Sequence, residues 1–416
     1  MIIKDVNHSH NTRSRFFYGY IVVAACFILQ LVMFGTLSSF GIYFKPILLD
    51  FSWSRALISG AFSISTVVRG LAGIAMGHLN DKLGPRAVMT LCGFLLGIGY
   101  LLMSQINAAW QLYLFYVLII GIGMGGLIAP QLSTIARWFV KRRNVMTGIA
   151  IAGGGTGGIF MPPLINWLIA SYGWRDAYFL MGATVFVIVI LTAQFLRRDP
   201  TQMGQVPFGE DEGGEKESGL HAEGLSLKEA TYTRQFWMVF IVLFCFGFGA
   251  ITVVVHLVPH ITDLGISAAT AANVLATMGA TTLVGSIVMG IIANKIGNRR
   301  TLILSFILMS SALLWLFLAR EIWMFYIFAL VIGFVNGGIT VLQSTLIAEL
   351  FGIKSHGLIL GICNFGSTTG AASGPFIAGY VFDVTGSYQS AFLACASLAF
   401  VGLILSAILR PIKNAN

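Results

Sequence analysis

Charged side chains are scarce in this chain. Asp, Glu, Lys and Arg together make up 10% of its 416 residues, whereas roughly 25% is usual in a soluble domain. Hydrophobic residues account for 57%, and the mean hydropathy is +0.85. Apolar stretches of about 20 residues, each long enough to cross a hydrocarbon core as a helix, follow one another along the chain. This composition excludes a soluble globular protein and indicates a polytopic membrane protein.

The residue groups that hold metals or carry out nucleophilic catalysis are also lacking. The cysteines form no CxxC or Cys/His motif, and all lie inside apolar stretches: Cys26, Cys92, Cys245, Cys363 and Cys395. No cluster of His, Cys, Asp and Glu accompanies the apolar stretches. The glycine-rich segments 121–126 and 152–158 lack the preceding strand or the Gly-Lys-Ser/Thr sequence of nucleotide-binding loops. We therefore expect no metal, no cofactor and no enzymatic activity.

The apolar stretches predict the fold class. They indicate an all-α membrane protein with twelve transmembrane helices, centred near residues 30, 67, 95, 122, 158, 186, 248, 281, 309, 335, 369 and 398. Most Lys and Arg residues fall in segments that are cytoplasmic if both termini are. The positive-inside rule therefore predicts cytoplasmic termini in the inner (plasma) membrane, and it explains the net charge of +9 without a nucleic-acid partner.

One long hydrophilic stretch divides the chain. Residues 197–234 contain eight of the 16 acidic residues, and this composition indicates a cytoplasmic linker. The linker separates two predicted six-helix bundles, at 16–196 and 235–409. Cytoplasmic tails at 1–15 and 410–416 complete the predicted domain organisation.

The two predicted bundles repeat each other in sequence. A loop with the pattern G-x-L-x-D-x-x-G-x-R follows the second helix at Gly77, Asp81, Gly84 and Arg86. The equivalent positions, 213 residues later, are Gly290, Asn294, Gly297 and Arg299. Arg137 corresponds to Glu349 at an offset of 212. An even number of helices separates the copies, so both have the same orientation, and such parallel halves can rock about a central site.

Together these features resemble the major facilitator superfamily over the whole chain. Within it, the chain is similar to the bacterial branch of the monocarboxylate transporter and oxalate/formate antiporter group, through Phe17-Tyr18-Gly19-Tyr20 and Phe44-Lys45-Pro46-Ile47-Leu48. The resemblance implies alternating access by a monomer in the lipid bilayer. It also implies that the substrates are small organic anions, above all monocarboxylates, moved by proton symport or anion exchange. An exporter of amphipathic compounds is the alternative within the superfamily.

Arg69 is the leading candidate for substrate binding. Animal members of the group carry an Asp and an Arg in helix 8, where this chain has Thr282 and Ser286, so their site does not transfer. Arg69 lies eight residues before Gly77 and therefore near the bilayer middle, where a charge is costly and usually serves a substrate or ion pathway. No Asp or Glu lies in any apolar core, so we expect an anionic substrate to complete the pair. The alternative is that backbone carbonyls and neighbouring amides satisfy Arg69.

Further polar residues within the predicted helices are candidates for lining the substrate cavity or for joining helices by hydrogen bonds. They are Gln30, Tyr116, Gln131, His256, Asn336, Gln343 and Asn364. A histidine titrates near neutral pH, so His256 is also the candidate for proton coupling. Its alternative role is to anchor the outer end of its helix at the membrane interface.

The repeated loops are expected to form a gate at the cytoplasmic face. The resemblance implies that Asp81 caps the start of helix 11 near Gly357, where the helix dipole favours an anion. It further implies that Arg86 and Arg137 complete a charge latch. The second bundle has the uncharged Asn294 and the acidic Glu349 at the equivalent positions, so its part of the gate must use different pairs, together with Gly290, Gly297 and Arg299.

Overall fold

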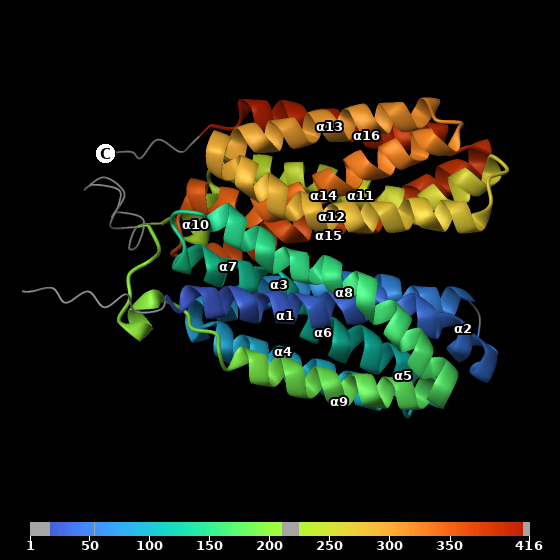
Figure 1. The fold of residues 1–416 in the computed structure, drawn as a ribbon, viewed down its shortest axis with the longest axis horizontal. Helices are drawn as coiled ribbons and strands as arrows, with labels where there is room; N and C mark the ends of the chain where they lie inside the picture. Colours follow the sequence, from blue (N-terminus) through green and yellow to red (C-terminus); the bar gives the residue numbers. More distant parts are fainter. Residues whose placement is uncertain (1–16, 54, 210–223, 411–416) are drawn as a thin grey trace, which may run out of the picture.

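The computed structural model describes residues 17–53, 55–209 and 224–410, and nearly all of them are helical (Figure 1). One set of helices, here called the first bundle, comprises α1 (Gly19–Ser38), α2 (Phe40–Phe51), α3 (Arg55–Leu83), α4 (Pro85–Met103), α5 (Ala109–Leu112), η1 (Tyr113–Ile120), α6 (Gly121–Gly123), η2 (Met124–Leu127), α7 (Ala129–Trp138), α8 (Arg143–Tyr172) and α9 (Trp174–Ala193).

The remaining long helices form the second bundle, which comprises α11 (Arg234–Asp263), α12 (Ala268–Ile296), α13 (Asn298–Leu318), α14 (Ile322–Phe351), α15 (His356–Thr385) and α16 (Gln389–Ile408). In the chain segment that connects the two bundles lie the short helices η3 (Pro200–Met203) and α10 (Leu227–Thr231). The all-α fold class predicted from the sequence is therefore confirmed.

Eleven segments of the described chain are long and apolar enough to span a membrane. The α1–α2 pair and the run from α5 to α7 each count as one such segment. The twelfth predicted span corresponds to α15, which has 30 residues but is rich in Gly, Ser and Thr. Its small and polar residues lower its hydropathy, and they let it pack closely against neighbouring helices.

The fourth predicted helix is irregular. It begins as α5, continues as the π-helix η1, the short α6 and the 3-10 helix η2, and ends as α7. Pro130 lies in the first turn of α7 and has no N–H to donate to the carbonyl of Gly126, four residues earlier. Gln131 supplies the missing donor, because its side-chain Nε2 lies 3.2 Å from Gly126 O.

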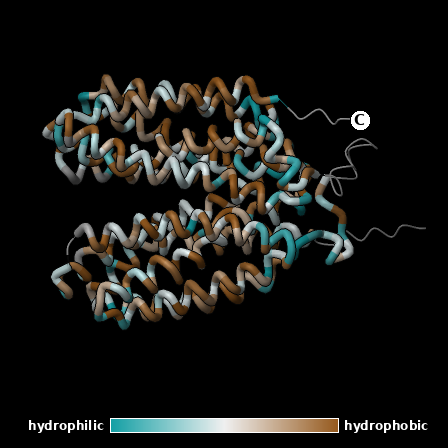
Figure 2. The backbone as a smooth tube through the Cα atoms, turned by 180° about the vertical axis from the view of Figure 1, so that it is seen from behind, coloured by the Kyte–Doolittle hydropathy of each residue, from teal (hydrophilic) through white to brown (hydrophobic). Residues whose placement is uncertain are grey.

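The two bundles lie side by side (Figure 1). Within the first, α1 packs against α8 and α4 against α9; within the second, α11 packs against α15, α12 against α14 and α13 against α16. The main contacts between the bundles join α3 to α15 and α8 to α12. The end that carries α7 and α10 is called the linker end here, and the opposite end is called the far end. Hydrophilic segments gather at the linker end, while hydrophobic residues follow the helices (Figure 2).

Glycines bring the bundles together at the linker end. A Cβ atom at Gly77 of α3 would overlap the carbonyl oxygen of Gly357 in α15. A Cβ at Gly290 of α12 would lie 2.7 Å from the carbonyl oxygen of Asn144 in α8. Nearer the far end, by contrast, a Cβ at Gly279 of α12 would meet no atom within 4 Å. The bundles therefore touch closely at the linker end, and Figure 2 shows them diverging toward the far end.

Candidate functional site

Arg69 is the central residue of α3, and its side chain is half-buried. The guanidinium interacts electrostatically with the phenol groups of Tyr100 on α4 and Tyr116 on η1. The Tyr100 hydroxyl in turn lies near the side chain of Thr36 on α1. No Asp or Glu in the described ranges forms an ion pair with Arg69. The cation thus lies among neutral phenols in the membrane-spanning part of the first bundle.

A buried cluster of tyrosines extends from this point. The rings of Tyr43 and Tyr178 stack with their centroids 3.7 Å apart, and the Tyr100 ring lies 6.3 Å from that of Tyr178. The Tyr178 hydroxyl is buried and has no hydrogen-bond partner among the described residues. Sequence reasoning identified Tyr116 alone of these tyrosines. The cluster draws on four segments, α2, α4, η1 and α9, whose meeting point cannot be read from spacing along the chain.

Gln30 and Gln131 lie inside the first bundle rather than on a cavity surface. Their exposed fractions are 3% and 0%. Gln30 Nε2 donates to Leu127 O at 2.6 Å, which joins α1 to η2. Gln131 satisfies the carbonyl of Gly126, as described above. In this conformation both amides therefore serve backbone carbonyls of the irregular fourth span, and neither is available to line a cavity.

The candidates in the second bundle are spread over three helices. Asn336 and Gln343 lie on α14, and each has a buried side-chain oxygen with no hydrogen-bond partner among the described residues. Asn364 lies half-buried on α15. His256 Nε2 lies 2.9 Å from Pro375 O, so this histidine joins α11 to α15. No interaction within the described ranges connects any of the four to Arg69.

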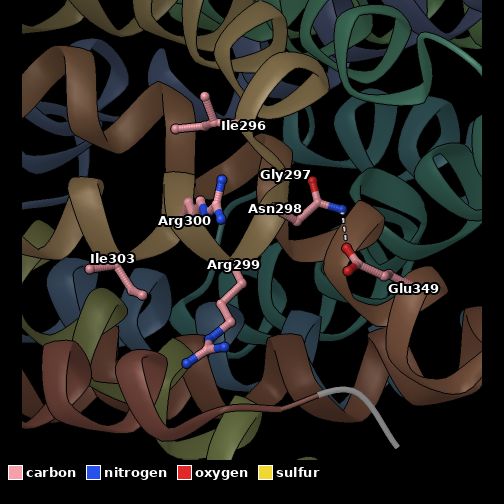
Figure 3. A pocket seen from close by; sticks show the side chains of 7 residues that line it. All are labelled: Ile296, Gly297, Asn298, Arg299, Arg300, Ile303 and Glu349. Atoms are coloured by element: carbon pink, nitrogen blue, oxygen red, sulfur yellow. Dashed lines mark hydrogen bonds between the residues drawn. The ribbon is translucent and has the colours of Figure 1, made fainter.

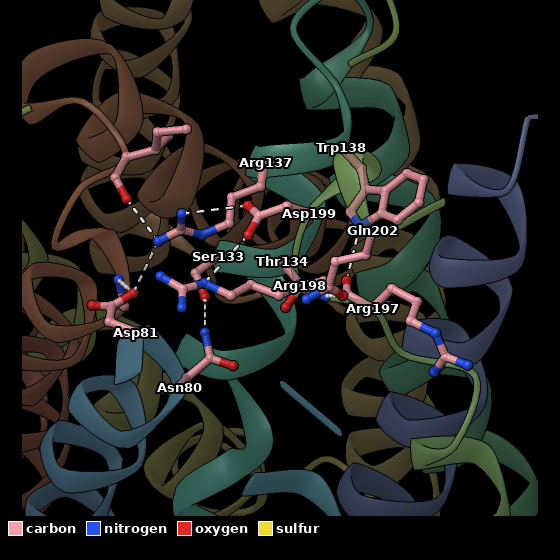
Figure 4. Close-up of polar contacts among 12 residues, drawn as sticks. Asn80, Asp81, Ser133, Thr134, Arg137, Trp138, Arg197, Arg198, Asp199 and Gln202 are labelled. Carbon is pink, nitrogen blue, oxygen red and sulfur yellow. Dashed lines mark hydrogen bonds and ion pairs between the residues drawn. The ribbon is translucent and has the colours of Figure 1, made fainter. Parts of the chain in front are cut away.

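The linker end holds a group of polar contacts, here called the latch, between Asp81 and its partners (Figure 4). Asp81 Oδ1 accepts from Gly357 N at 3.2 Å, and Oδ2 accepts from Leu358 N at 3.0 Å. These N–H groups belong to the first turn of α15, where they have no partner within the helix. The helix dipole favours a negative charge at this place. Asp81 therefore caps α15, which is the contact that the resemblance implies.

Arg137 is the cationic member of the latch. Its Nη2 lies 3.3 Å from Asp81 Oδ1, and the exposed fractions of the two side chains are 8% and 10%. The same nitrogen donates to Ile353 O at 2.8 Å, which connects the first bundle directly to the loop before α15. A further acid, Asp199, lies 3.6 Å from Arg137 Nη1. Sequence reasoning missed Asp199, because the sequence of the linker does not show which of its acidic residues contacts the first bundle.

The linker contacts both bundles at equivalent places. Phe208 N donates to Trp138 O at 3.0 Å, at the end of α7. Leu225 N donates to Phe351 O at 2.9 Å, at the end of α14. Phe139, which follows Trp138, and Phe351 occupy matching positions in the sequence repeat. The linker therefore bridges the two bundles at the end where they are closed.

The second bundle has an uncharged counterpart of the latch. Asn294, the equivalent of Asp81, accepts from Asn144 Nδ2 at 3.0 Å. Asn144 lies in the first turn of α8, as Gly357 lies in the first turn of α15. Gly84 and Gly297 precede α4 and α13 with φ angles of +84° and +88°, a region that favours glycine.

The arginines of the repeated loops brace helices within each bundle. Arg86 Nε donates to Gln194 Oε1 at 2.7 Å, so Arg86 joins α4 to the end of α9 and takes no part in the latch expected of it. Arg299 likewise hydrogen-bonds to Ala407 O of α16. Glu349 accepts from Asn298 Nδ2 at 2.6 Å. It lines a cleft of about 380 Å³ together with Ile296, Gly297, Asn298, Arg299, Arg300 and Ile303 (Figure 3).

The two sites differ in what they can do chemically. Arg69 offers a planar fork of donors that matches a carboxylate, beside phenols that can also donate hydrogen bonds. The latch instead joins α3 and α7 of the first bundle to α15 and the loop before it. No group of three or more metal-ligating side chains occurs in the part of the chain that the structure describes.

Comparisons with known proteins agree with this architecture. The sequence profile of the Major Facilitator Superfamily matches residues 26–267 and 239–416. Monocarboxylate transporter 13 of Rattus norvegicus is 28% identical over 400 residues, which span 92% of this chain and 87% of that protein. The E. coli fucose:proton symporter superposes with a TM-score of 0.73 at 16% identity, over 95% of this chain and 100% of the other. A human organic anion transporter superposes with a TM-score of 0.66 at 16% identity, over 94% and 97%.

Proposed function

This chain belongs to the Major Facilitator Superfamily, and on that premise we propose that it carries small organic anions, chiefly monocarboxylates, by alternating access. As a multi-pass transporter it has a small-molecule substrate. In the proposal it functions as a monomer in the inner (plasma) membrane, with the linker end and both termini in the cytoplasm. The structure then corresponds to a state that is closed to the cytoplasm and open outward.

The observation that carries the proposal is the isolated cation at the middle of α3. A charged side chain at the bilayer centre costs at least about 2.5 kcal/mol. The nearby groups of Tyr100 and Tyr116 are phenols, which carry no negative charge to compensate that of Arg69. A bound carboxylate would neutralise it and accept two parallel hydrogen bonds. The name of the rat relative supports monocarboxylates as the class of anion.

The latch supplies the moving part of the proposed cycle. The contacts of Asp81 and Arg137 with α15 and its preceding loop must break before the linker end can open. An anion that enters from the far end would bind near Arg69 first. The bound anion would neutralise the guanidinium, so the first bundle would no longer carry an uncompensated charge when it moves relative to the second. The substrate would then leave at the linker end.

Uptake into proteoliposomes tests the proposal. Purified protein should take up at least one of lactate, pyruvate, formate, acetate and oxalate, and Arg69→Gln should lower that uptake by tenfold or more. Arg175→Gln is the matched control, because Arg175 also lies in the first bundle but pairs with Asp50 on the exposed surface. Wild-type uptake by Arg69→Gln would refute the role of Arg69. Transport of amphipathic compounds alone would favour the exporter.

The same vesicles distinguish the two forms of coupling. Proton symport predicts accumulation of the anion in empty vesicles when the outside is more acidic than the inside. Anion exchange predicts uptake that requires an anion trapped inside and does not depend on the pH gradient.

A further inference from the structure

His356, the first residue of α15, is a buried histidine that the proposed cycle does not use. Its exposed fraction is 0%. Nε2 lies 2.9 Å from Ser344 O of α14, which fits a neutral ring that donates from this nitrogen. Nδ1 is buried and has no hydrogen-bond partner among the described residues. A proton on Nδ1 would therefore create a buried N–H group without an acceptor, which is costly.

The charges around His356 also oppose its protonation. Arg137 of α7 and Arg143 of α8 both interact electrostatically with the imidazole. The start of α15 adds the partial positive charge of the helix dipole. The neighbouring carboxylates are committed elsewhere, because Asp81 of α3 binds Arg137 and caps α15, while Glu349 of α14 binds Asn298. The closed linker end thus holds His356 as a neutral group.

The position of His356 makes this environment dependent on conformation. Ser344, whose carbonyl contacts the ring, donates from its hydroxyl to Leu132 O of α7 at 3.2 Å, across the two bundles. Arg137 and Arg143 both belong to the first bundle, whereas His356 belongs to the second. In the proposed cycle, opening of the linker end would carry both arginines away with the first bundle and let water reach the ring. Opening would therefore remove the two nearby cations and give Nδ1 a water as acceptor, while the dipole of α15 would stay.

We propose that His356 is a proton-binding site that is available only when the linker end is open. A proton from that side would hold the carrier in the open state until it dissociates. This inference rests on the alternating-access part of the proposed function and not on the anion site. A free imidazole titrates near pH 6.5, so acidification from about pH 8 to about pH 5.5 should raise the ratio of open to closed molecules about tenfold.

A distance measurement between two spin labels tests this inference. Ala87→Cys on α4 and Lys295→Cys on α12 place the labels at exposed positions at the linker end, one on each bundle. The native cysteines are buried, which favours labelling of the introduced ones. In the double-cysteine protein, the population with the longer separation should rise about tenfold relative to the shorter one over this pH range. His356→Gln should abolish the response.

Two further variants complete the experiment. His78→Gln is the matched control, because His78 lies on α3 at the same end but outside the contacts of His356, and it should keep the full pH response. His356→Lys carries a charge at both pH values and should hold the longer separation at each. An unchanged distance distribution in the double-cysteine protein would overturn the inference without any variant, and so would a full response in His356→Gln. The readout needs no substrate, so absent anion uptake would leave its result intact.

Discussion

Neutralising Asp81 should open the linker end. In Asp81→Asn the side chain keeps its shape, but one carboxylate oxygen becomes an NH2 group. Asp81 accepts from three donors, namely Gly357 N, Leu358 N and Arg137 Nη2. An asparagine cannot accept all three, and its NH2 group would face another donor. The charge that both the helix dipole and Arg137 stabilise is lost as well.

The size of the effect follows from these contacts. Loss of the charge at the start of α15 costs about 1 kcal/mol. Loss of the charge-assisted hydrogen bond to the largely buried Arg137 costs about 1–2 kcal/mol, since Arg137 keeps Ile353 O and Asp199 as partners. The closed state should thus lose about 2–3 kcal/mol relative to the open state. This corresponds to a shift of about 30- to 150-fold in their ratio.

The labels at positions 87 and 295 measure this ratio directly. Asp81→Asn should move most molecules to the longer separation at neutral pH. Asp50→Asn is the matched control, because Asp50 also pairs with an arginine, Arg175 at 2.6 Å, but on the exposed surface and within one bundle. A distance distribution in Asp81→Asn that matches that of Asp50→Asn would refute the latch.

Three further predictions follow from other contacts. Gly77→Ala should favour the longer label separation, because its Cβ would overlap Gly357 O, whereas Gly279→Ala, which meets no atom within 4 Å, should not; equal distributions would contradict this. Asp199→Asn should have a smaller effect than Asp81→Asn, less than about tenfold, because Asp199 is 33% exposed and 3.6 Å from Arg137; an equal or larger shift would be inconsistent with this ranking. His256→Gln should abolish accumulation driven by a pH gradient but preserve exchange of labelled for unlabelled anion in vesicles, and unchanged accumulation would exclude His256 as the coupling residue.

The fold follows from the sequence for a clear reason, whereas the cap at α15 is implied by the resemblance of the loop around Asp81 to the major facilitator superfamily. A long apolar stretch in a membrane predicts a helix, because its backbone N–H and C=O groups find no water and must form hydrogen bonds within the segment. The loop pattern around Asp81 then repeats, with the change to Asn294, in the second bundle. The same pattern misleads for Arg86, because a loop motif gives the residue but not the direction of a long side chain, and Arg86 turns to Gln194 instead.

The polar residues inside helices show where sequence reasoning stops. A glutamine in an apolar helix either lines a cavity or satisfies a neighbouring backbone, and both choices give the same sequence pattern. Gln131 takes the second role because Pro130 frees the carbonyl of Gly126, and Gln30 does so at Leu127. The neighbours of Arg69 come from separate helices, so only the packed structure shows that the phenols of Tyr100 and Tyr116 lie near the guanidinium.

Direct binding to purified protein tests the central claim most closely. Wild type, Arg69→Gln and the control Arg175→Gln should each be titrated with lactate, pyruvate, formate, acetate and oxalate while the unfolding temperature is recorded. If Arg69 binds the substrate, at least one anion should raise the unfolding temperature of wild type and Arg175→Gln, and Arg69→Gln should lose this response. Equal stabilisation of all three proteins, or no response of wild type to any anion, would contradict this claim.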